Sequence, residues 1–174
     1  MNIAILVFLS VGVAFPQSRV KDEPLAAVKF FAGRWQGTGT GEPGKSTVER
    51  EYQFVLGGKF LQVKNVSRWA PRDKNPTGET HEDLGLMSYD TARKTIIYRQ
   101  FHIEGFVNQH VMEPIRDPKT LVFVSEAIEN IAPGWRARET YHILGQDEFE
   151  EVFELAAPGK EFELYSKSHL HRRR

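Results

Sequence analysis

Turn-forming residues recur at short intervals along the chain and divide most of it into ten segments of strand length. The segments are rich in Val, Ile, Thr, Tyr and Phe, and apolar residues alternate with polar ones, which is typical of β-strands. Residue pairs that favour tight turns lie between them, such as Gly57-Gly58, Glu104-Gly105 and Pro133-Gly134. The pattern predicts strands over residues 34–40, 47–55, 58–68, 78–89, 93–103, 106–114, 119–127, 135–144, 147–155 and 161–171.

Short connections between consecutive strands favour an antiparallel meander, and closing that meander into a barrel pairs both of its edge strands. A barrel of this strand number has room for a small ligand. Residues 24–32 fit a short helix, because Pro24 is tolerated in a first turn and Gly33 can end the helix. The sequence therefore predicts an all-β fold: a ten-stranded antiparallel up-and-down β-barrel with a short N-terminal helix, forming one domain over residues 24–174.

The N-terminus carries a targeting signal. Residues 3–15, IAILVFLSVGVAF, form an apolar run that is shorter than the roughly 20 residues a membrane-spanning helix needs. Gly12 and Ala14 are small residues at the −3 and −1 positions of a signal-peptidase site. We predict a signal peptide over residues 1–14, a linker over 15–23, and a periplasmic or extracellular protein without a transmembrane span; a hydrophobic N-terminal strand is the alternative.

Composition excludes several classes of function. The 174 residues include 23 basic and 23 acidic side chains, so the net charge is zero and no basic surplus indicates a nucleic-acid partner. The chain has no Cys, which excludes disulfides, thiolate metal sites and a cysteine nucleophile. The composition leaves the oligomeric state open.

Charged residues share strand faces with aromatic residues, which a dry barrel core would not show. Alternation places Glu151 on the same strand face as Phe153. It likewise places Arg50 on the face of Tyr52. Because a buried charge needs a partner, ordered water or a ligand, such faces indicate a cavity that holds something partly polar.

The segment RQFHIEGFVNQH, residues 99–110, carries the clearest mixture of this kind. A two-residue turn at Glu104-Gly105 predicts that Arg99 pairs with His110 and that Phe101 pairs with Asn108. We predict that these four residues face the cavity, since Ile97, Phe106 and Met112 then lie inside with them and the buried apolar area is larger. The other face would bury Tyr98, Gln100, His102 and Val107 instead.

Arg99 and His110 would repel each other across this hairpin if both were charged. We therefore expect either a low pKa for His110 or an acidic group between the two side chains. An anionic ligand head group fills that role, as do Glu126, Glu139 and Glu151. The predicted ligand-binding residues are Tyr52, Arg99, Phe101, Phe106, Asn108, His110, Glu126, Glu139, Tyr141, Glu151 and Phe153.

Motifs for catalysis or metal binding find no support in the sequence. Gly39 to Ser46 matches the G-x-x-x-x-G-K-S phosphate-loop pattern, but that loop needs a helix after it and residues 47–55 read as a strand. His169 and His171 share one strand face and favour solvent-facing histidines beside an arginine tail over a metal pair. We predict neither a metal site nor catalytic residues, and a binding protein rather than an enzyme.

Four segments resemble a known family. FAGRWQGTGTG at 31–41, GGKFLQVKNVSR at 57–68, HEDLGLMSYD at 81–90 and LHRRR at 170–174 are similar, in this order, to segments of nitrobindin-like haem-binding barrels. The Gly-x-Trp start is shared with the wider lipocalin and fatty-acid-binding (calycin) superfamily. Over residues 25–174 the chain resembles uncharacterised bacterial lipocalin-like barrel proteins more closely still.

This resemblance implies roles for residues at the two ends of the barrel. Trp35 is expected to close one end, with Arg172 or Arg173 stacked on its indole. The resemblance also implies haem bound through a residue near the C-terminus, and it places Tyr165 at the ligand position with His169 nearby. The chain departs from nitrobindins at Glu42-Pro43, where they have Tyr-Pro.

Three functions follow from these observations. The first is binding of a small hydrophobic or amphipathic ligand inside the barrel. The second is a haem protein acting on peroxynitrite or nitric oxide. The third is a barrel whose interior is filled by side chains and which serves as an interaction module.

Overall fold

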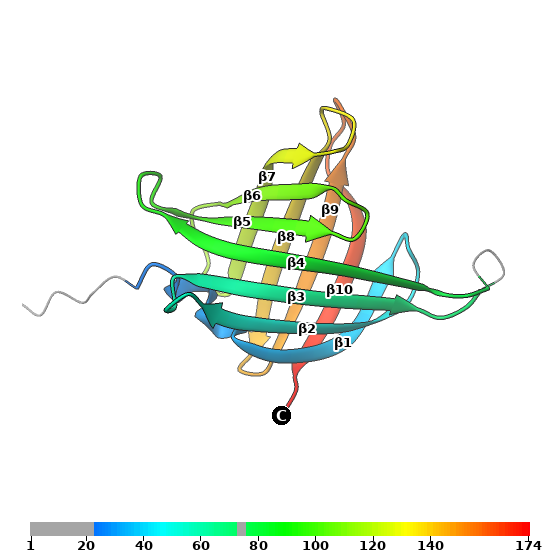
Figure 1. The fold of residues 1–174 in the computed structure, drawn as a ribbon, viewed down its shortest axis with the longest axis horizontal. Coiled ribbons are helices and arrows are strands. Elements are labelled where there is room, and N and C mark those ends of the chain that lie inside the picture. The colour runs from blue at the N-terminus through cyan, green and yellow to red at the C-terminus, as the bar shows by residue number, and fades with distance from the viewer. Residues whose placement is uncertain (1–22, 73–75) are drawn as a thin grey trace, which may run out of the picture.

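The strands close into the predicted barrel in the computed structural model, which describes residues 23–72 and 76–174 (Figure 1). All neighbours are antiparallel and the order around the barrel is β1-β10-β9-β8-β7-β6-β5-β4-β3-β2, so β1 and β10 close the sheet. Each strand bound differs from its predicted value by two residues or fewer. The strands are β1 (Gly33–Gly41), β2 (Ser46–Val55), β3 (Phe60–Trp69), β4 (Glu79–Asp90), β5 (Thr95–His102), β6 (Val107–Met112), β7 (Thr120–Glu129), β8 (Arg136–Gly145), β9 (Glu148–Ala156) and β10 (Glu163–Arg172).

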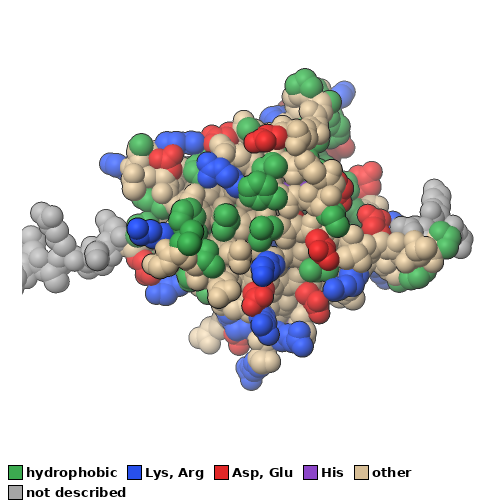
Figure 2. Space-filling model, in the orientation of Figure 1, with side chains coloured by type: hydrophobic (Ala, Val, Ile, Leu, Met, Phe, Trp, Pro, Cys, Tyr) green, Lys and Arg blue, Asp and Glu red, His purple; other side chains and the backbone are tan. Residues whose placement is uncertain are grey.

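The predicted signal peptide at 1–14 and all but the last residue of the predicted linker at 15–23 lie outside the described residues. Among the residues that are described, no helix is long and apolar enough to cross a membrane. The face of the barrel shown in Figure 2 carries basic and acidic side chains interspersed with hydrophobic ones.

The predicted helix is a short 3-10 helix, η1 (Ala26–Phe31), that covers one end of the barrel. Its Phe31 is fully buried and lies in ring contact with aromatic residues of three strands. The ring centroids are 5.3 Å from Tyr52, 5.1 Å from Tyr141 and 5.1 Å from Phe149. This aromatic layer, together with Trp35, closes the end of the barrel under η1.

Arg172 makes the predicted contact with Trp35. Its guanidinium carbon lies 4.1 Å from the centre of the Trp35 ring, and its N–H groups donate to the carbonyls of Ala32 (2.7 Å) and Phe30 (2.9 Å). The Trp35 indole N–H donates to the Phe31 carbonyl at 2.6 Å. The first and last strands and η1 are thus joined at the closed end.

Close packing of β1 on β10 explains one glycine of the Gly-x-Trp segment. A Cβ atom built on Gly37 would lie 1.8 Å from the carbonyl oxygen of His169 on β10. Any larger residue at this position would force the two strands apart, so the seam of the barrel depends on glycine here.

The β5–β6 hairpin differs from its predicted register by one residue. Tyr98, not Arg99, pairs with His110, and Gln100 pairs with Asn108. The loop has three residues instead of two, because the His102 N–H donates to the Phe106 carbonyl (3.1 Å) and Gly105 takes a positive φ of 88°. This shift turns β5 over relative to β6, so Arg99 faces solvent while Asn108 and His110 stay inside.

Candidate functional site

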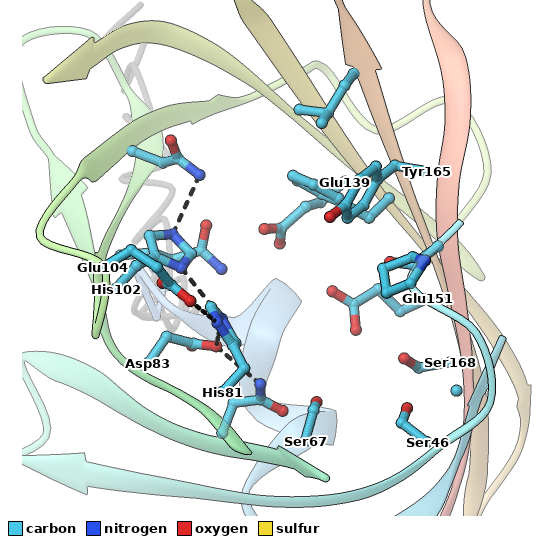
Figure 3. A pocket seen from close by; sticks show the side chains of 18 of the residues that line it. Ser46, Ser67, His81, Asp83, His102, Glu104, Glu139, Glu151, Tyr165 and Ser168 are labelled. Carbon is cyan, nitrogen blue, oxygen red and sulfur yellow. Dashed lines mark hydrogen bonds and ion pairs between the residues drawn. The ribbon is translucent and has the colours of Figure 1, made fainter. Parts of the chain in front are cut away.

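A cavity of about 440 Å³ fills the barrel end opposite η1 (Figure 3). Small-molecule cavities have volumes of about 300–1,000 Å³, so this one has room for a small organic molecule. The cavity argues against the alternative in which side chains fill the interior. Its apolar lining residues include Trp69, Phe106, Ile128, Ile131, Trp135, Phe153 and Leu155.

An ion pair between Arg50 and Glu151 lies in the polar part of the cavity wall. Strands β2 and β9 are not neighbours, so the pair spans the interior. Both side chains are about nine-tenths buried. Arg50 also donates from Nε to the Asn65 amide oxygen (3.0 Å) and from a terminal nitrogen to the Tyr52 hydroxyl (3.3 Å). These bonds satisfy the one arginine or lysine among the described residues that line the cavity.

Two histidines and an aspartate form a second polar group, which Asn65 links to Arg50. His81 and Asp83 alternate along β4, and Asp83 pairs with His102 of β5, so all three side chains point inward. His81 Nε2 lies 3.5 Å from Asp83 Oδ2 and 3.4 Å from His102 Nδ1. His81 Nδ1 lies 2.8 Å from the carboxylate of Glu104 in the β5–β6 loop. The hydrogen bond with Asp83 raises the pKa of His81 to about 9.

Glu139 is a buried carboxyl group at the cavity. Its side chain points inward from β8, and the Tyr141 hydroxyl donates to it at 2.6 Å. Burial raises the pKa of Glu139 to about 8, and the nearby charge of Glu151 acts in the same direction. The group is therefore mostly neutral at pH 7, and a protonated carboxyl can both donate and accept hydrogen bonds.

Two amide side chains of the wall have an unpaired oxygen. Gln100 Oε1 and Asn108 Oδ1 are buried and find no hydrogen-bond partner among the described residues. The Gln100 amide nitrogen donates to the Tyr98 hydroxyl at 3.1 Å. The Asn108 amide nitrogen lies 3.2 Å from His102 Nε2. Buried polar atoms are nearly always paired, so these two acceptors mark where a donor from another molecule fits.

Most of the predicted ligand-binding residues lie in or directly under the cavity. Those that line it are Phe106, Asn108, Glu139, Glu151 and Phe153. Tyr52 and Tyr141 are fully buried in the aromatic core toward η1. His110 is fully buried with neither ring nitrogen paired, and burial, rather than a charged Arg99, lowers its pKa to about 3.

Three predicted residues lie on the outer surface, and for these the prediction was wrong. Arg99 donates to the Gln109 amide oxygen at 2.8 Å on the outer face. Phe101 is 44% exposed because it follows Arg99 by two residues on the same strand. Glu126 is the extra residue of a β-bulge between β6 and β7, which turns it outward to pair with Arg93 at 2.7 Å.

Several cavity residues were not among the predicted ones: Arg50, Asn65, His81, Asp83, Gln100 and His102. The available signal was alternation, since His81 and Asp83 share the strand face of buried Met87. Asn65 and Ser67 likewise follow buried Val63 at intervals of two residues. A polar residue two positions from a buried apolar one on the same strand therefore indicates a residue that lines the cavity.

The two residues that the nitrobindin resemblance implies as haem ligands, Tyr165 and His169, lie in different places. Tyr165 lines the cavity from a bulge in β10, but burial and the acidic groups Glu42, Glu79 and Glu104 raise its pKa and disfavour the phenolate that would bind iron. His169 points outward and pairs with Glu148 at 2.7 Å. His169 therefore lies outside the cavity, whereas Tyr165 lies in its wall with a pKa that opposes the phenolate form.

Comparison with solved structures finds a chain of the same fold. The chain is similar to the structure described as "Crystal Structure of Rv2717c from M. tuberculosis", with a TM-score of 0.66, 20% sequence identity, and coverage of 87% of this chain and 98% of that one. A weaker match is a de novo designed fluorescence-activating β-barrel, with a TM-score of 0.39, 11% identity, and coverage of 85% and 97%. No protein-family model and no curated protein matches the chain. The strand order and the cavity define the class of protein: an antiparallel ten-stranded β-barrel with a cavity at one end.

Proposed function

We propose that the cavity binds one small amphipathic molecule, with its polar end against the inner wall and its apolar part against the rim. The observation that carries this proposal is the pair of unpaired buried acceptors, Gln100 Oε1 and Asn108 Oδ1. A ligand group that donates hydrogen bonds would satisfy them, whereas an unpaired buried acceptor costs about 1–3 kcal/mol. The apolar side chains of Phe106 and Phe153 supply the contact area for the rest of the molecule.

The charges of the lining favour a neutral or cationic ligand over an anionic one. Arg50 is already paired with Glu151. The lining also contains the acidic side chains of Glu79, Asp83 and Glu104. Arg99, the cation that an anionic head group was predicted to contact, lies on the outer face of the barrel. An alcohol or amine with an apolar chain therefore matches the cavity better than a carboxylate.

The experiment is displacement of the neutral fluorescent probe N-phenyl-1-naphthylamine by four compounds that are each built on a ten-carbon chain and differ in the head group. We expect decylamine and decan-1-ol to displace the probe at lower concentration than methyl decanoate, which cannot donate, and decanoate, which is anionic. No displacement by any of the four, together with no bound mass in native mass spectrometry of protein from its source cells, would contradict ligand binding.

Two glutamines of the same hairpin provide the variant and its control. Gln100→Leu removes an inward acceptor and should remove the preference for decylamine and decan-1-ol over methyl decanoate. Gln109→Leu makes the same chemical change on the outer face, where Gln109 bonds to Arg99, and should keep that preference. An equal effect of both variants would mean that Gln100 does not contact the head group.

We also propose that the protein is exported after removal of residues 1–14. The apolar run followed by Gly12 and Ala14 supports this. The intact mass of protein purified from its native host should correspond to a chain that begins near Phe15. A mass that includes Met1 would refute export by this route.

A further inference from the structure

We propose that His81, Asp83 and His102 bind a zinc ion at the cavity wall. The site goes beyond the amphipathic ligand proposed above and shares one residue with it: when zinc is bound, the Asn108 oxygen pairs with His102, and Gln100 Oε1 is the acceptor left for the ligand. The nitrogen and oxygen atoms that would bind the ion all lie within 4.8 Å of one another. All three side chains come from adjacent strands of the barrel wall, β4 and β5, and are held there by ladder pairing.

Two of the three distances between these atoms match tetrahedral coordination. Zinc bonds of about 2.0–2.1 Å at a tetrahedral angle place neighbouring ligand atoms roughly 3.4 Å apart. His81 Nε2 lies 3.4 Å from His102 Nδ1 and 3.5 Å from Asp83 Oδ2. Two imidazole nitrogens and one carboxylate oxygen form a ligand set that zinc accepts, as in sites with two His and one Glu.

Each of the three proposed ligands has a supporting residue. The Asn65 amide donates to Asp83 Oδ2 at 2.8 Å, and the Glu104 carboxylate lies 2.8 Å from the second nitrogen of His81. A carboxylate on the far nitrogen of a metal-binding histidine orients the ring and increases its basicity. The site therefore has an outer layer of the kind that zinc sites use.

Asn108 is the supporting residue of the third proposed ligand, His102. With zinc on Nδ1, His102 carries its proton on Nε2 and needs an acceptor there. Rotating the Asn108 amide by half a turn presents its oxygen, which has no partner, to that N–H. In this arrangement the amide oxygen of Asn108, a residue that is only 2% exposed, has a partner, and zinc on Nδ1 would fix the His102 tautomer that supplies it.

Three protein ligands leave the fourth zinc position open toward the cavity. In Figure 3 the group of His81, Asp83 and His102 lies on one side of the cavity, and Glu139 and Glu151 lie on the other. A water molecule or a ligand atom can take the open position, which is the arrangement of zinc sites that act on bound molecules. The cavity would then combine a Lewis acid with the apolar rim.

A second group of suitable residues serves as a matched control. Glu148, His169 and His171 bring three ligand atoms equally close together on the outer face, where His171 is exposed. No supporting residue holds this group, among the described residues, apart from the bond between His169 and Glu148. It provides histidine variants that leave the cavity unchanged.

The test is titration of the full chain with Co²⁺, read by the visible absorption of tetrahedral cobalt, followed by competition with Zn²⁺. We expect one cobalt ion per chain with tetrahedral bands that zinc abolishes. His102→Gln should weaken binding by more than the roughly 10–100-fold that loss of a supporting residue causes, and Glu104→Gln should fall within that range. His171→Gln should keep the wild-type affinity.

Far-ultraviolet circular dichroism without metal checks that each variant is folded. If His102→Gln does not fold, the Glu104→Gln variant decides, because its side chain is on an exposed loop. Absence of tetrahedral bands, equal affinity of the wild type and the folded His102→Gln or Glu104→Gln variant, or loss of binding in His171→Gln would each overturn the proposal.

Discussion

Replacing Trp35 tests whether the closed end holds the barrel together. The side chain is 1% exposed and lies between Arg172, Phe149 and η1. Trp35→Ala removes the ring from this layer and also removes the donor that pairs with the Phe31 carbonyl at 2.6 Å. Trp35→Phe keeps an aromatic ring and removes only the indole N–H and part of the volume.

The contacts set the size of the effect. Truncating a buried Trp to Ala costs about 3–5 kcal/mol, and an acceptor left without its donor adds about 1 kcal/mol. Arg172 keeps its bonds to the Ala32 and Phe30 carbonyls, so the substitution leaves no unpaired charge. We therefore expect a loss of about 4–6 kcal/mol for Trp35→Ala and about 1–3 kcal/mol for Trp35→Phe.

Guanidinium chloride unfolding followed by circular dichroism measures both values, provided the slope against denaturant stays that of the wild type. Trp135→Ala is the control, because Trp135 lies at the rim with 39% of its surface exposed and should change stability by less than about 1 kcal/mol. A loss below about 1 kcal/mol for Trp35→Ala, or equal losses at Trp35 and Trp135, would refute this account of the closed end.

Three further predictions concern buried titratable groups. Removing one member of the Arg50–Glu151 pair, as in Glu151→Gln, should lower the free energy of unfolding by about 3–5 kcal/mol, because it leaves a buried charge without a partner. Replacing both residues by apolar ones should lower it far less. Additive losses of the two single variants in urea unfolding would contradict this. His110→Phe should stabilise the fold more at pH 5 than at pH 8. Burial lowers the pKa of His110 to about 3, whereas the same side chain in the unfolded protein takes up a proton below about pH 6.5, so the histidine destabilises the fold at low pH. An equal gain in the free energy of unfolding at both pH values would count against this prediction. The pKa of Glu139 is raised to about 8 from the ordinary 4.5, so the free energy of unfolding should fall as pH rises between these values. Glu139→Gln should make this pH dependence flatter. An unchanged slope of the free energy of unfolding against pH would refute the prediction.

The strands and the closed end of the barrel can be predicted from the sequence because the residues that specify them are close together in the chain. Turn residues end each strand, and the Gly-x-Trp segment gives the contact of Trp35 with Arg172 by resemblance. The face that points inward is decided by alternation wherever the strand carries large apolar residues, as at Phe149. Strand positions and inward faces therefore depend on residues within a few positions of one another.

The parts that were predicted wrongly depend on one-residue shifts in register. Glu104-Gly105 looks like a two-residue turn, yet the loop includes Ile103 and this reverses the orientation of Arg99. The bulge at Glu126 changes orientation in the same way. No residue type marks either shift, because Gly serves both loop lengths and any residue can occupy a bulge.

The pairing of polar groups inside the cavity depends on the closed barrel rather than on any segment. Arg50 and Glu151 are 101 residues apart in sequence and lie on strands that are not neighbours. Their contact follows from the tilt of strands around a closed sheet, which the sequence pattern does not specify. The group formed by His81, Asp83 and His102 could not be predicted for the same reason, because only His81 and Asp83 are close in sequence.

The pairing of β1 with β10 has a consequence for synthesis of the chain. Successive hairpins can form as they leave the ribosome, but the outer edge of β1 waits for Arg172, which bonds to residues 140 and 142 positions earlier. At about 5–20 residues per second, that edge stays unpaired for roughly 7–28 s. Its sequence, GRWQGTGTG, has one large apolar side chain, so the unpaired edge of β1 has little tendency to pair with a strand of another nascent chain. The glycines of β1 thus protect the protein from aggregation before they serve the finished barrel.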